Sequence, residues 1–147
     1  MAAVRTATAT WNGDLMTGSG TTTAASSGQF KNLGVSWAAR TEAPGGKTSP
    51  EELLAAAHAS CFCMALSAGL ARAKTPPTKL EVSVSVTFDK VETGMKVTSS
   101  AIKVTGIVPG IDAATFKKAA EGAKDGCPIS GALKGNVALS VEATLAK

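Results

Sequence analysis

Apolar and polar residues alternate in several runs of the chain, which is typical of β-strands that bury one face. The clearest run, residues 80–88, reads LEVSVSVTF and places Leu80, Val82, Val84, Val86 and Phe88 on one side. A second long strand is expected over 95–108, after a turn at Gly94, and a last strand over 135–145.

The first 40 residues carry shorter strand signals. Residues 4–12 and 19–27 are rich in β-formers and are separated by the turn pair Asn12-Gly13. Val35 and Trp37, two residues apart, would share a face of a third strand. The pattern predicts a three-stranded antiparallel meander, followed by a loop over 41–48.

A long helix is expected to begin at Ser49-Pro50, where a capping residue precedes proline and two acidic residues. The run LLAAAHASCFCMALSAGLARA follows, and the helix should end near Ala73, before Pro76-Pro77. Because this run is apolar on nearly every side, we expect it to be buried on all sides.

Two further helices are indicated near the end of the chain. Asp112 is a candidate cap for a helix over 113–125, whose apolar face would hold Ala113, Phe116, Ala119 and Ala120. Gly126 should end it, and Cys127-Pro128 should open a short second helix. With about six strands and three helices in separate groups, the chain is predicted to be a single α+β domain over 1–147.

Composition narrows the possible functions of the 147 residues. The net charge is +4, but the 15 basic residues are spread thinly and lack interleaved aromatics, so nucleic-acid binding is not expected. No run approaches the roughly 20 apolar residues of a membrane span, and Met1–Trp11 lacks the apolar core of a signal peptide. Three cysteines argue against a secreted disulfide scaffold and favour a reducing cytoplasm.

The cysteines are the candidate chemistry, and three interpretations compete for Cys61. It could be a buried core residue, a metal ligand or a reactive thiol. Cys61 and Cys63 lie about 200° apart around a helix, and the one histidine, His58, makes a poor zinc site with Cys61, so no metal is expected. Cys63 is interpreted as a core filler. A Cys–His hydrolase is disfavoured because His58 is badly placed.

The position of Cys127 favours the interpretation of Cys61 as a reactive thiol. Cys127 precedes Pro128 at the mouth of a helix, where amides favour a thiolate or its partner. Two distant cysteines can act as a peroxidatic and resolving pair, provided that their Cα atoms approach to about 6 Å.

Residues 48–62, TSPEELLAAAHASCF, resemble the central helix of the osmotically inducible protein C (OsmC) family. VPGID at 108–112 and AKDGCPIS at 123–130 resemble later signatures of that family, and WNGD at 11–14 fits its opening hairpin. The resemblance implies an OsmC-like fold, with antiparallel sheets around a long central helix, in an intertwined homodimer.

The resemblance also implies an activity, the reduction of organic hydroperoxides and, more weakly, hydrogen peroxide in stress defence. Carried over by position, Cys61 is the peroxidatic thiol and Cys127 the resolving thiol. No cofactor is implied, because sulfur carries the electrons, and an external dithiol of lipoyl or thioredoxin type would restore the enzyme. A non-catalytic binding or redox-sensing module on the same fold is the alternative.

Arg40 matches the arginine of the OsmC branch, and Glu51 the acid that holds it. The organic hydroperoxide resistance branch carries its arginine in the first hairpin loop, but residues 13–20 contain no Arg or Lys here. A guanidinium would favour the Cys61 thiolate and hold peroxide oxygens. Glu52 is the fallback anchor.

The position of Glu51 in the long helix has a further implication. Ten residues of one helix separate it from Cys61, about 15 Å. If Glu51 serves the Cys61 site, it is therefore expected to come from the partner subunit.

Overall fold

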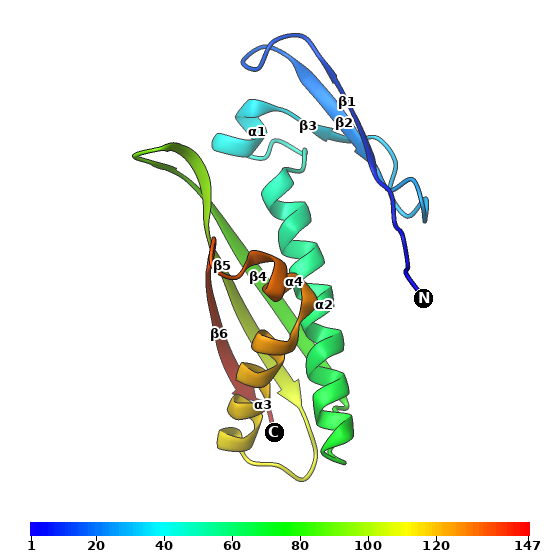
Figure 1. Ribbon diagram of the computed structural model, residues 1–147, viewed down its shortest axis with the longest axis vertical. Helices are drawn as coiled ribbons and strands as arrows, with labels where there is room; N and C mark the ends of the chain where they lie inside the picture. The colour runs from blue at the N-terminus through cyan, green and yellow to red at the C-terminus, as the bar shows by residue number, and fades with distance from the viewer. The chain divides into compact units, whose positions relative to one another are not determined.

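A computed structural model describes all 147 residues and has the α+β architecture that the sequence predicts (Figure 1). It contains two three-stranded sheets and four helices. By its internal contacts the chain divides into two compact units, Met1–Leu53 and Leu54–Lys147, and the long helix α2 begins in the first and continues through the second.

The first unit holds the predicted meander. Its strands β1 (Thr8–Asn12), β2 (Ser19–Thr23) and β3 (Leu33–Val35) pair antiparallel in chain order. Gly13, in the turn after β1, has φ +87°, a conformation that glycine adopts without steric cost.

One element of this unit differs from the expectation. Trp37 does not extend the third strand but begins a short helix, α1 (Trp37–Thr41). The cause is Ser36, whose hydroxyl accepts a hydrogen bond from the amide of Ala39 at 3.2 Å and so caps the helix.

The long helix α2 spans Pro50–Arg72, within a residue of the predicted range. Ser49 Oγ accepts from the Glu52 amide at 3.2 Å, as a capping residue does. The second unit's sheet contains β4 (Lys79–Val91), β5 (Gly94–Ile107) and β6 (Ala138–Leu145), in that spatial order.

The expectation of purely antiparallel sheets is wrong for β6. β4 and β5 pair antiparallel through the tight turn at Gly94, with Val82 opposite Val104, but β6 runs parallel to β5, with Ala143 opposite Val104. Parallel neighbours need a crossover connection. Helices α3 (Ala113–Gly126) and α4 (Pro128–Leu133) form that connection.

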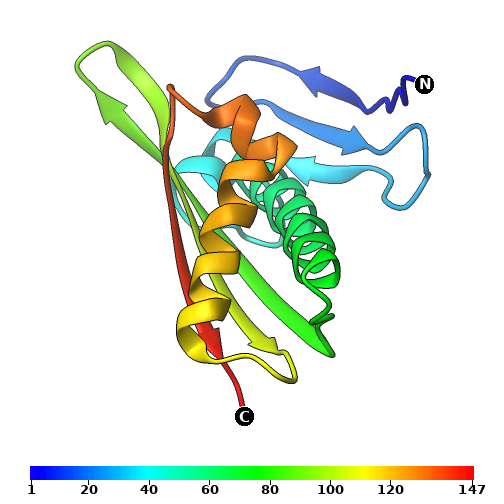
Figure 2. The ribbon, with the colours of Figure 1, turned by 60° about the horizontal axis from the view of Figure 1, so that its bottom comes forward.

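Both α2 and α3 pack on one face of this sheet, and α3 lies beside β6 (Figure 2). Asp112 caps α3, as predicted, through a 2.7 Å bond from the Thr115 amide to its carboxylate. One buried cluster joins α2, α3 and the sheet. Its largest members are Phe62, Leu66 and Leu70 of α2, Ile102 and Val104 of β5, and Phe116 of α3.

The expectation that α2 is buried on all sides is wrong for this chain. His58, Phe62, Leu66 and Leu70 recur every four residues along one buried stripe, whereas Met64 is 67% exposed. Small alanines elsewhere on the helix leave much of its surface apolar and open to solvent.

The expectation that no segment is long and apolar enough to span a membrane is wrong for α2. By length and composition alone it is a helix that could cross a membrane, contrary to the expectation that no run approaches that size. A core helix meets the same two criteria, and Phe62 and Leu66 are fully buried against the sheet and α3.

Candidate active site

Two cysteines meet where α2 passes the junction of α3 and α4. Cys61 lies on α2 and is partly buried, while Cys127 is 1% exposed between the two shorter helices. Their sulfur atoms are 3.0 Å apart, within hydrogen-bond distance. The fold therefore holds two thiols from distant parts of the chain in direct contact.

Local backbone structure fixes the position of Cys127. Its amide donates to the carbonyl of Ala123 at 2.9 Å, which closes α3, and its own carbonyl accepts from Gly131 at 2.9 Å, which starts α4. Pro128 stands at the first position of α4, where a missing N–H costs nothing.

The environments of the two sulfurs move their pKa values in opposite directions. Burial raises the pKa of Cys61, and its hydrogen bond with Cys127 raises it further. Burial also acts to raise the pKa of Cys127. Its hydrogen bond with Cys61, the amide and hydroxyl of Ser130 and the amide of Ile129 outweigh burial, so the pKa is lowered. Of the two thiols, Cys127 is therefore the more acidic.

A buried histidine lies close to this pair. His58 is fully buried on α2, with its Nδ1 2.7 Å from the Ser100 hydroxyl of β5 and its Nε2 2.8 Å from the Ser130 hydroxyl of α4. Burial lowers the pKa of His58, so the ring is neutral at physiological pH.

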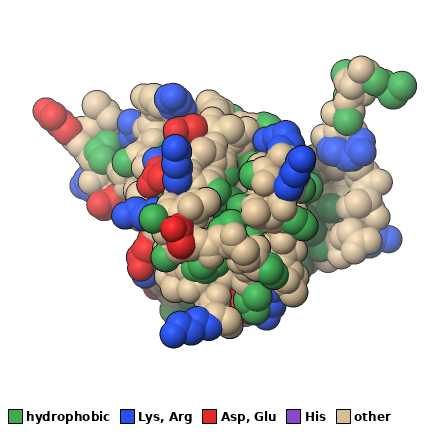
Figure 3. All heavy atoms as spheres, turned by 90° about the horizontal axis from the view of Figure 1, so that it is seen from below, with side chains coloured by type: hydrophobic (Ala, Val, Ile, Leu, Met, Phe, Trp, Pro, Cys, Tyr) green, Lys and Arg blue, Asp and Glu red, His purple; other side chains and the backbone are tan.

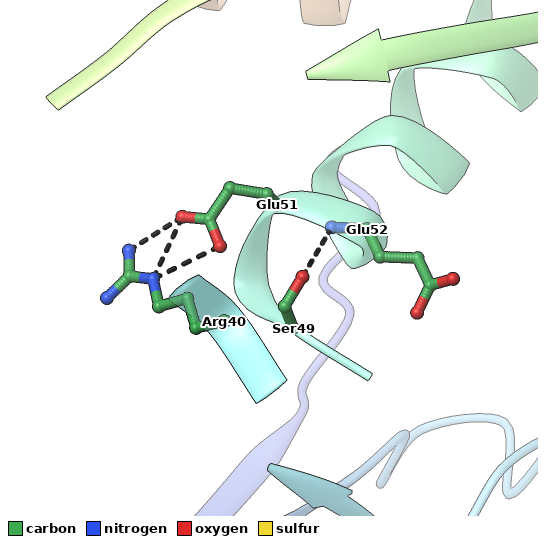
Figure 4. A network of polar contacts seen from close by, with 4 residues as sticks. All are labelled: Arg40, Ser49, Glu51 and Glu52. Atoms are coloured by element: carbon green, nitrogen blue, oxygen red, sulfur yellow. Dashed lines mark hydrogen bonds and ion pairs between the residues drawn. The ribbon is translucent and has the colours of Figure 1, made fainter. Parts of the chain in front are cut away.

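The ion pair Arg40–Glu51 belongs to the first unit (Figure 4). Arg40 Nη2 donates to Glu51 Oε1 at 2.6 Å, and Arg40 Nε contacts both carboxylate oxygens at 3.1 Å. Glu52 points away from Arg40 in Figure 4 and accepts instead from the Thr48 hydroxyl at 2.6 Å. Of the two acids, Glu51 is therefore the one that binds the arginine.

Arg40 also borders an apolar hollow of about 390 Å³. Its guanidinium carbon lies 5.9 Å from the centre of the Trp37 ring, a distance at which cations and aromatic rings attract each other. The hollow is lined by Trp11, Leu15, Val35, Ser36, Trp37, Arg40 and Pro50.

A second, larger hollow of about 770 Å³ opens beside Cys61, between α2 and α3. Small and apolar side chains form most of its walls, among them Met64, Ala65 and Ala119, with Arg72 and Lys118 at its border. Cys63 does not face it but lines a separate hollow with Ala71 and Leu80. The two thiols of the Cys-Phe-Cys segment thus face different surroundings, as the helical spacing predicts.

Other kinds of site find little support. No group of three His, Cys, Asp or Glu side chains comes together in a way that could hold a metal ion. On the face in Figure 3, Lys and Arg side chains lie scattered, with Asp and Glu among them.

Comparison with known proteins now decides the family. The profile of the OsmC-like protein family matches residues 43–142, which include both cysteines of the pair. The chain belongs to the OsmC-like protein family.

Named relatives of this OsmC-like protein agree with that assignment. It is 42% identical over 132 residues to the peroxiredoxin OsmC of Escherichia coli strain K12, covering 90% of this chain and 91% of that protein. It is 32% identical over 96 residues to an organic hydroperoxide resistance protein of Xanthomonas axonopodis pv. citri, covering 65% and 66%. The crystal structure of the organic hydroperoxide resistance protein OhrB of Bacillus subtilis superposes with a TM-score of 0.73, at 26% identity and with 95% and 98% of the chains covered. The OsmC-like fold expected from the sequence is thereby confirmed.

The candidate residues of this OsmC-like protein form two pairs, Cys61 with Cys127 and Arg40 with Glu51. The first pair lies in residues 54–147 and the second in residues 1–53. Sequence reasoning missed the links from His58 to Ser100 and Ser130. The signal that could have found them was a polar residue on the same stripe as Phe62 and Leu66, where a buried histidine requires partners.

Proposed function

We propose that this OsmC-like protein is a thiol-dependent peroxidase that reduces organic hydroperoxides through Cys61 and Cys127. The observation that carries the proposal is the 3.0 Å separation of the two sulfurs beside an apolar hollow of about 770 Å³. The names of its relatives, a peroxiredoxin and organic hydroperoxide resistance proteins, support the same activity.

The reaction takes three steps. The Cys61 thiolate attacks one peroxide oxygen, the O–O bond breaks, and the alkoxide leaves and takes up a proton to become an alcohol. Cys61 is then a sulfenic acid. Cys127 attacks the oxidised sulfur, an S–S bond forms, and hydroxide leaves as water. An external dithiol of lipoyl or thioredoxin type reduces the disulfide, which returns both thiols.

In this scheme Arg40 stabilises the Cys61 thiolate, and Glu51 holds Arg40 in position. Burial and Cys127 raise the pKa of Cys61, so the thiol needs a nearby cation to become a thiolate. A guanidinium supplies that charge and donates to the departing alkoxide, and the carboxylate of Glu51 keeps it aimed. Glu51 and Cys61 lie about 15 Å apart along α2. We therefore assign Arg40 and Glu51 to the Cys61 site of a partner subunit in a homodimer.

The apolar walls of the hollow indicate the substrate class. An alkyl or lipid chain gains about 0.8 kcal/mol for each methylene buried there, which hydrogen peroxide does not. We therefore expect higher catalytic efficiency with alkyl hydroperoxides than with hydrogen peroxide. The site needs no metal or organic cofactor, and a reducing cytoplasm suits its thiols.

The test mixes reduced protein with one equivalent of cumene hydroperoxide and maps the cysteines by mass spectrometry. A Cys61–Cys127 disulfide should form rapidly and should disappear in Cys61→Ser. Cys63→Ser is the matched control, because Cys63 lies on the same helix but faces another hollow, and it should react like the wild type. Three free thiols with the peroxide unconsumed would refute the peroxidase and favour a non-catalytic binding module.

A further inference from the structure

Both tryptophans of the chain lie at the hollow of about 390 Å³ that Arg40 borders. Trp11 belongs to β1 and Trp37 to α1. Leu15, in the loop after β1, lines the same hollow, and the whole lining belongs to the first unit. Trp11 is 41% exposed and Leu15 54%. Large apolar side chains that gather around one hollow mark a binding surface, whereas single exposed ones need no explanation.

The pairing of the first sheet explains how Trp11 reaches this hollow. Trp11 is paired with Gly20 of β2, and Gly20 in turn with Val35 of β3. Residues opposite one another in antiparallel strands share a face, so Trp11 and Val35 flank Gly20 on one side of the sheet. A Cβ on Gly20 would lie 2.8 Å from Cε3 of the Trp11 ring and 3.3 Å from Cγ2 of Val35. The ring can lie against β2 because glycine has no Cβ there.

The Trp11 ring is also held in one orientation. Its Nε1–H donates to the carbonyl of Gly13 at 3.0 Å. A Cβ on Gly18 would lie 3.0 Å from the same Nε1, so the ring packs on glycine backbone at two places. A side chain that is ordered in advance loses little conformational entropy when a ligand packs on it. Trp11 is therefore a preorganised wall of the hollow, although it is partly exposed.

The lining suits the two ends of an organic hydroperoxide. Arg40 is the one charged residue of the lining, and apart from Ser36, which caps α1, the other lining residues are apolar. The Trp37 ring lies 5.9 Å from the guanidinium carbon of Arg40. A guanidinium donates to peroxide oxygens, and indole rings pack against a hydrocarbon or aromatic group. Hydrogen peroxide has no organic group that these rings can bind.

We propose that Trp11, Leu15 and Trp37 are specificity-determining residues, which pack against the organic group of a hydroperoxide while Arg40 binds its oxygens. This inference rests on the proposed function, which assigns Arg40 to the peroxide. The preferred substrates are aryl hydroperoxides such as cumene hydroperoxide, because an aromatic group gains from contact with indole rings in addition to its burial. The tryptophans thus add an aromatic preference to the alkyl preference expected from the hollow beside Cys61.

Two neighbouring residues of one loop supply a matched pair of variants. Leu15 lines the hollow, whereas Met16, which is 70% exposed, does not. The measurement is the ratio of kcat/KM for cumene hydroperoxide to kcat/KM for hydrogen peroxide. Leu15→Ala should lower this ratio about fivefold and Trp11→Ala about tenfold, because contacts with the organic group are lost. Met16→Ala should keep the wild-type ratio, and a wild-type ratio in Leu15→Ala would overturn the proposal.

Tryptophan fluorescence measures binding without any turnover. Because Trp11 and Trp37 are the two tryptophans of the chain, the whole signal comes from this hollow. Cumyl alcohol, the product expected from cumene hydroperoxide, should change the emission in a saturable manner. In Leu15→Ala its half-saturating concentration should rise about fivefold, and in Met16→Ala it should stay at the wild-type value. No saturable change in the wild type would contradict the inference.

The same variants test whether a second copy of the chain covers the hollow instead. In that case Leu15→Ala should weaken the dimer in analytical ultracentrifugation and lower the turnover of both peroxides equally, which would overturn the inference. Leu15 is exposed, so its variant keeps the test decisive if Trp11→Ala does not fold. A wild type that consumes no peroxide would contradict the proposed function, and the fluorescence titration would then decide alone whether the hollow binds the organic group.

Discussion

Glu51 holds Arg40 with both of its carboxylate oxygens, at 2.6 Å to Nη2 and 3.1 Å to Nε, from a position only 8% exposed. An arginine fixed in this way presents its remaining N–H groups in one direction. Glu52, the next residue along the chain, accepts a hydrogen bond from the Thr48 hydroxyl instead.

The pair can be tested by an isosteric substitution with a matched control at Glu52. Glu51→Gln should lower hydroperoxide turnover by at least about tenfold and reduce the free energy of unfolding by about 1–3 kcal/mol, because a partly buried guanidinium loses its charged partner. Glu52→Gln should change either quantity only slightly. Steady-state kinetics and urea unfolding measure both, and equal effects of the two substitutions would show that Glu51 has no special role.

Assignment of Arg40 to the partner's Cys61 predicts complementation between two inactive variants. Cys61→Ser and Arg40→Ala should each be inactive alone. Unfolded together and refolded at equal amounts, they should recover about a quarter of wild-type activity, since about half of the dimers are mixed and each has one intact site. Recovery should be absent if the arginine serves its own chain, and activity per thiol that survives dilution to monomers would refute the shared site.

Stability should fall in mild acid because of His58. Its folded pKa lies below the ordinary value of 6.5, owing to burial. The corresponding stability is fully present above pH 6.5 and is lost as the pH falls toward the folded pKa, by at most about 1.4 kcal/mol for each pH unit. Asp14 and Asp112 titrate below 3.8 and do not contribute in this range.

Urea unfolding at pH 7.5 and 5.5 checks this expectation. Wild type should lose stability between the two values, and His58→Gln, which cannot titrate, should lose less. A pH dependence that is unchanged in His58→Gln would assign the effect to other groups.

Two glycines should respond to alanine with opposite signs. A Cβ on Gly106 of β5 would lie 2.4 Å from Cζ of Phe116, so Gly106→Ala should cost about 1–3 kcal/mol through a displaced ring. Gly122 lies inside α3, where an added Cβ would meet nothing within 4 Å, so Gly122→Ala should add about 0.5–1 kcal/mol. Thermal and urea unfolding distinguish the two, and a stabilised Gly106→Ala would contradict the packing of Phe116 against β5.

Local pattern was sufficient for the elements with strong periodicity. The alternation over 80–88 identified β4, and the Ser49-Pro50 start identified α2 almost to the residue. The short helix α1 was missed because one capping hydroxyl, at Ser36, decides it against a strand-like Val35 and Trp37. The parallel pairing of β6 could not be foreseen, because strand direction depends on the crossover rather than on the strand's own sequence.

The sequence suggested the candidate residues and the contact of Arg40 with Glu51, but not the contacts of His58. Family resemblance pointed to Cys61, Cys127, Arg40 and Glu51, and the structure shows the separation of the two sulfurs and the pairing of Arg40 with Glu51. The partners of His58 come from β5 and α4, 42 and 72 residues away. Such distances along the chain carry no local signal.

Cys61 and Cys127 are 66 positions apart in the chain, so a disulfide between them would affect the stability of the fold. A disulfide there would close a loop that contains the second half of α2 and all of β4, β5 and α3. It would remove about 4 kcal/mol of loop-closure entropy from the unfolded chain. By thermodynamic linkage, the same free energy favours the disulfide in the folded protein. The oxidised enzyme is therefore expected to be the more heat-resistant form, and its reductant must act on a protein that resists unfolding.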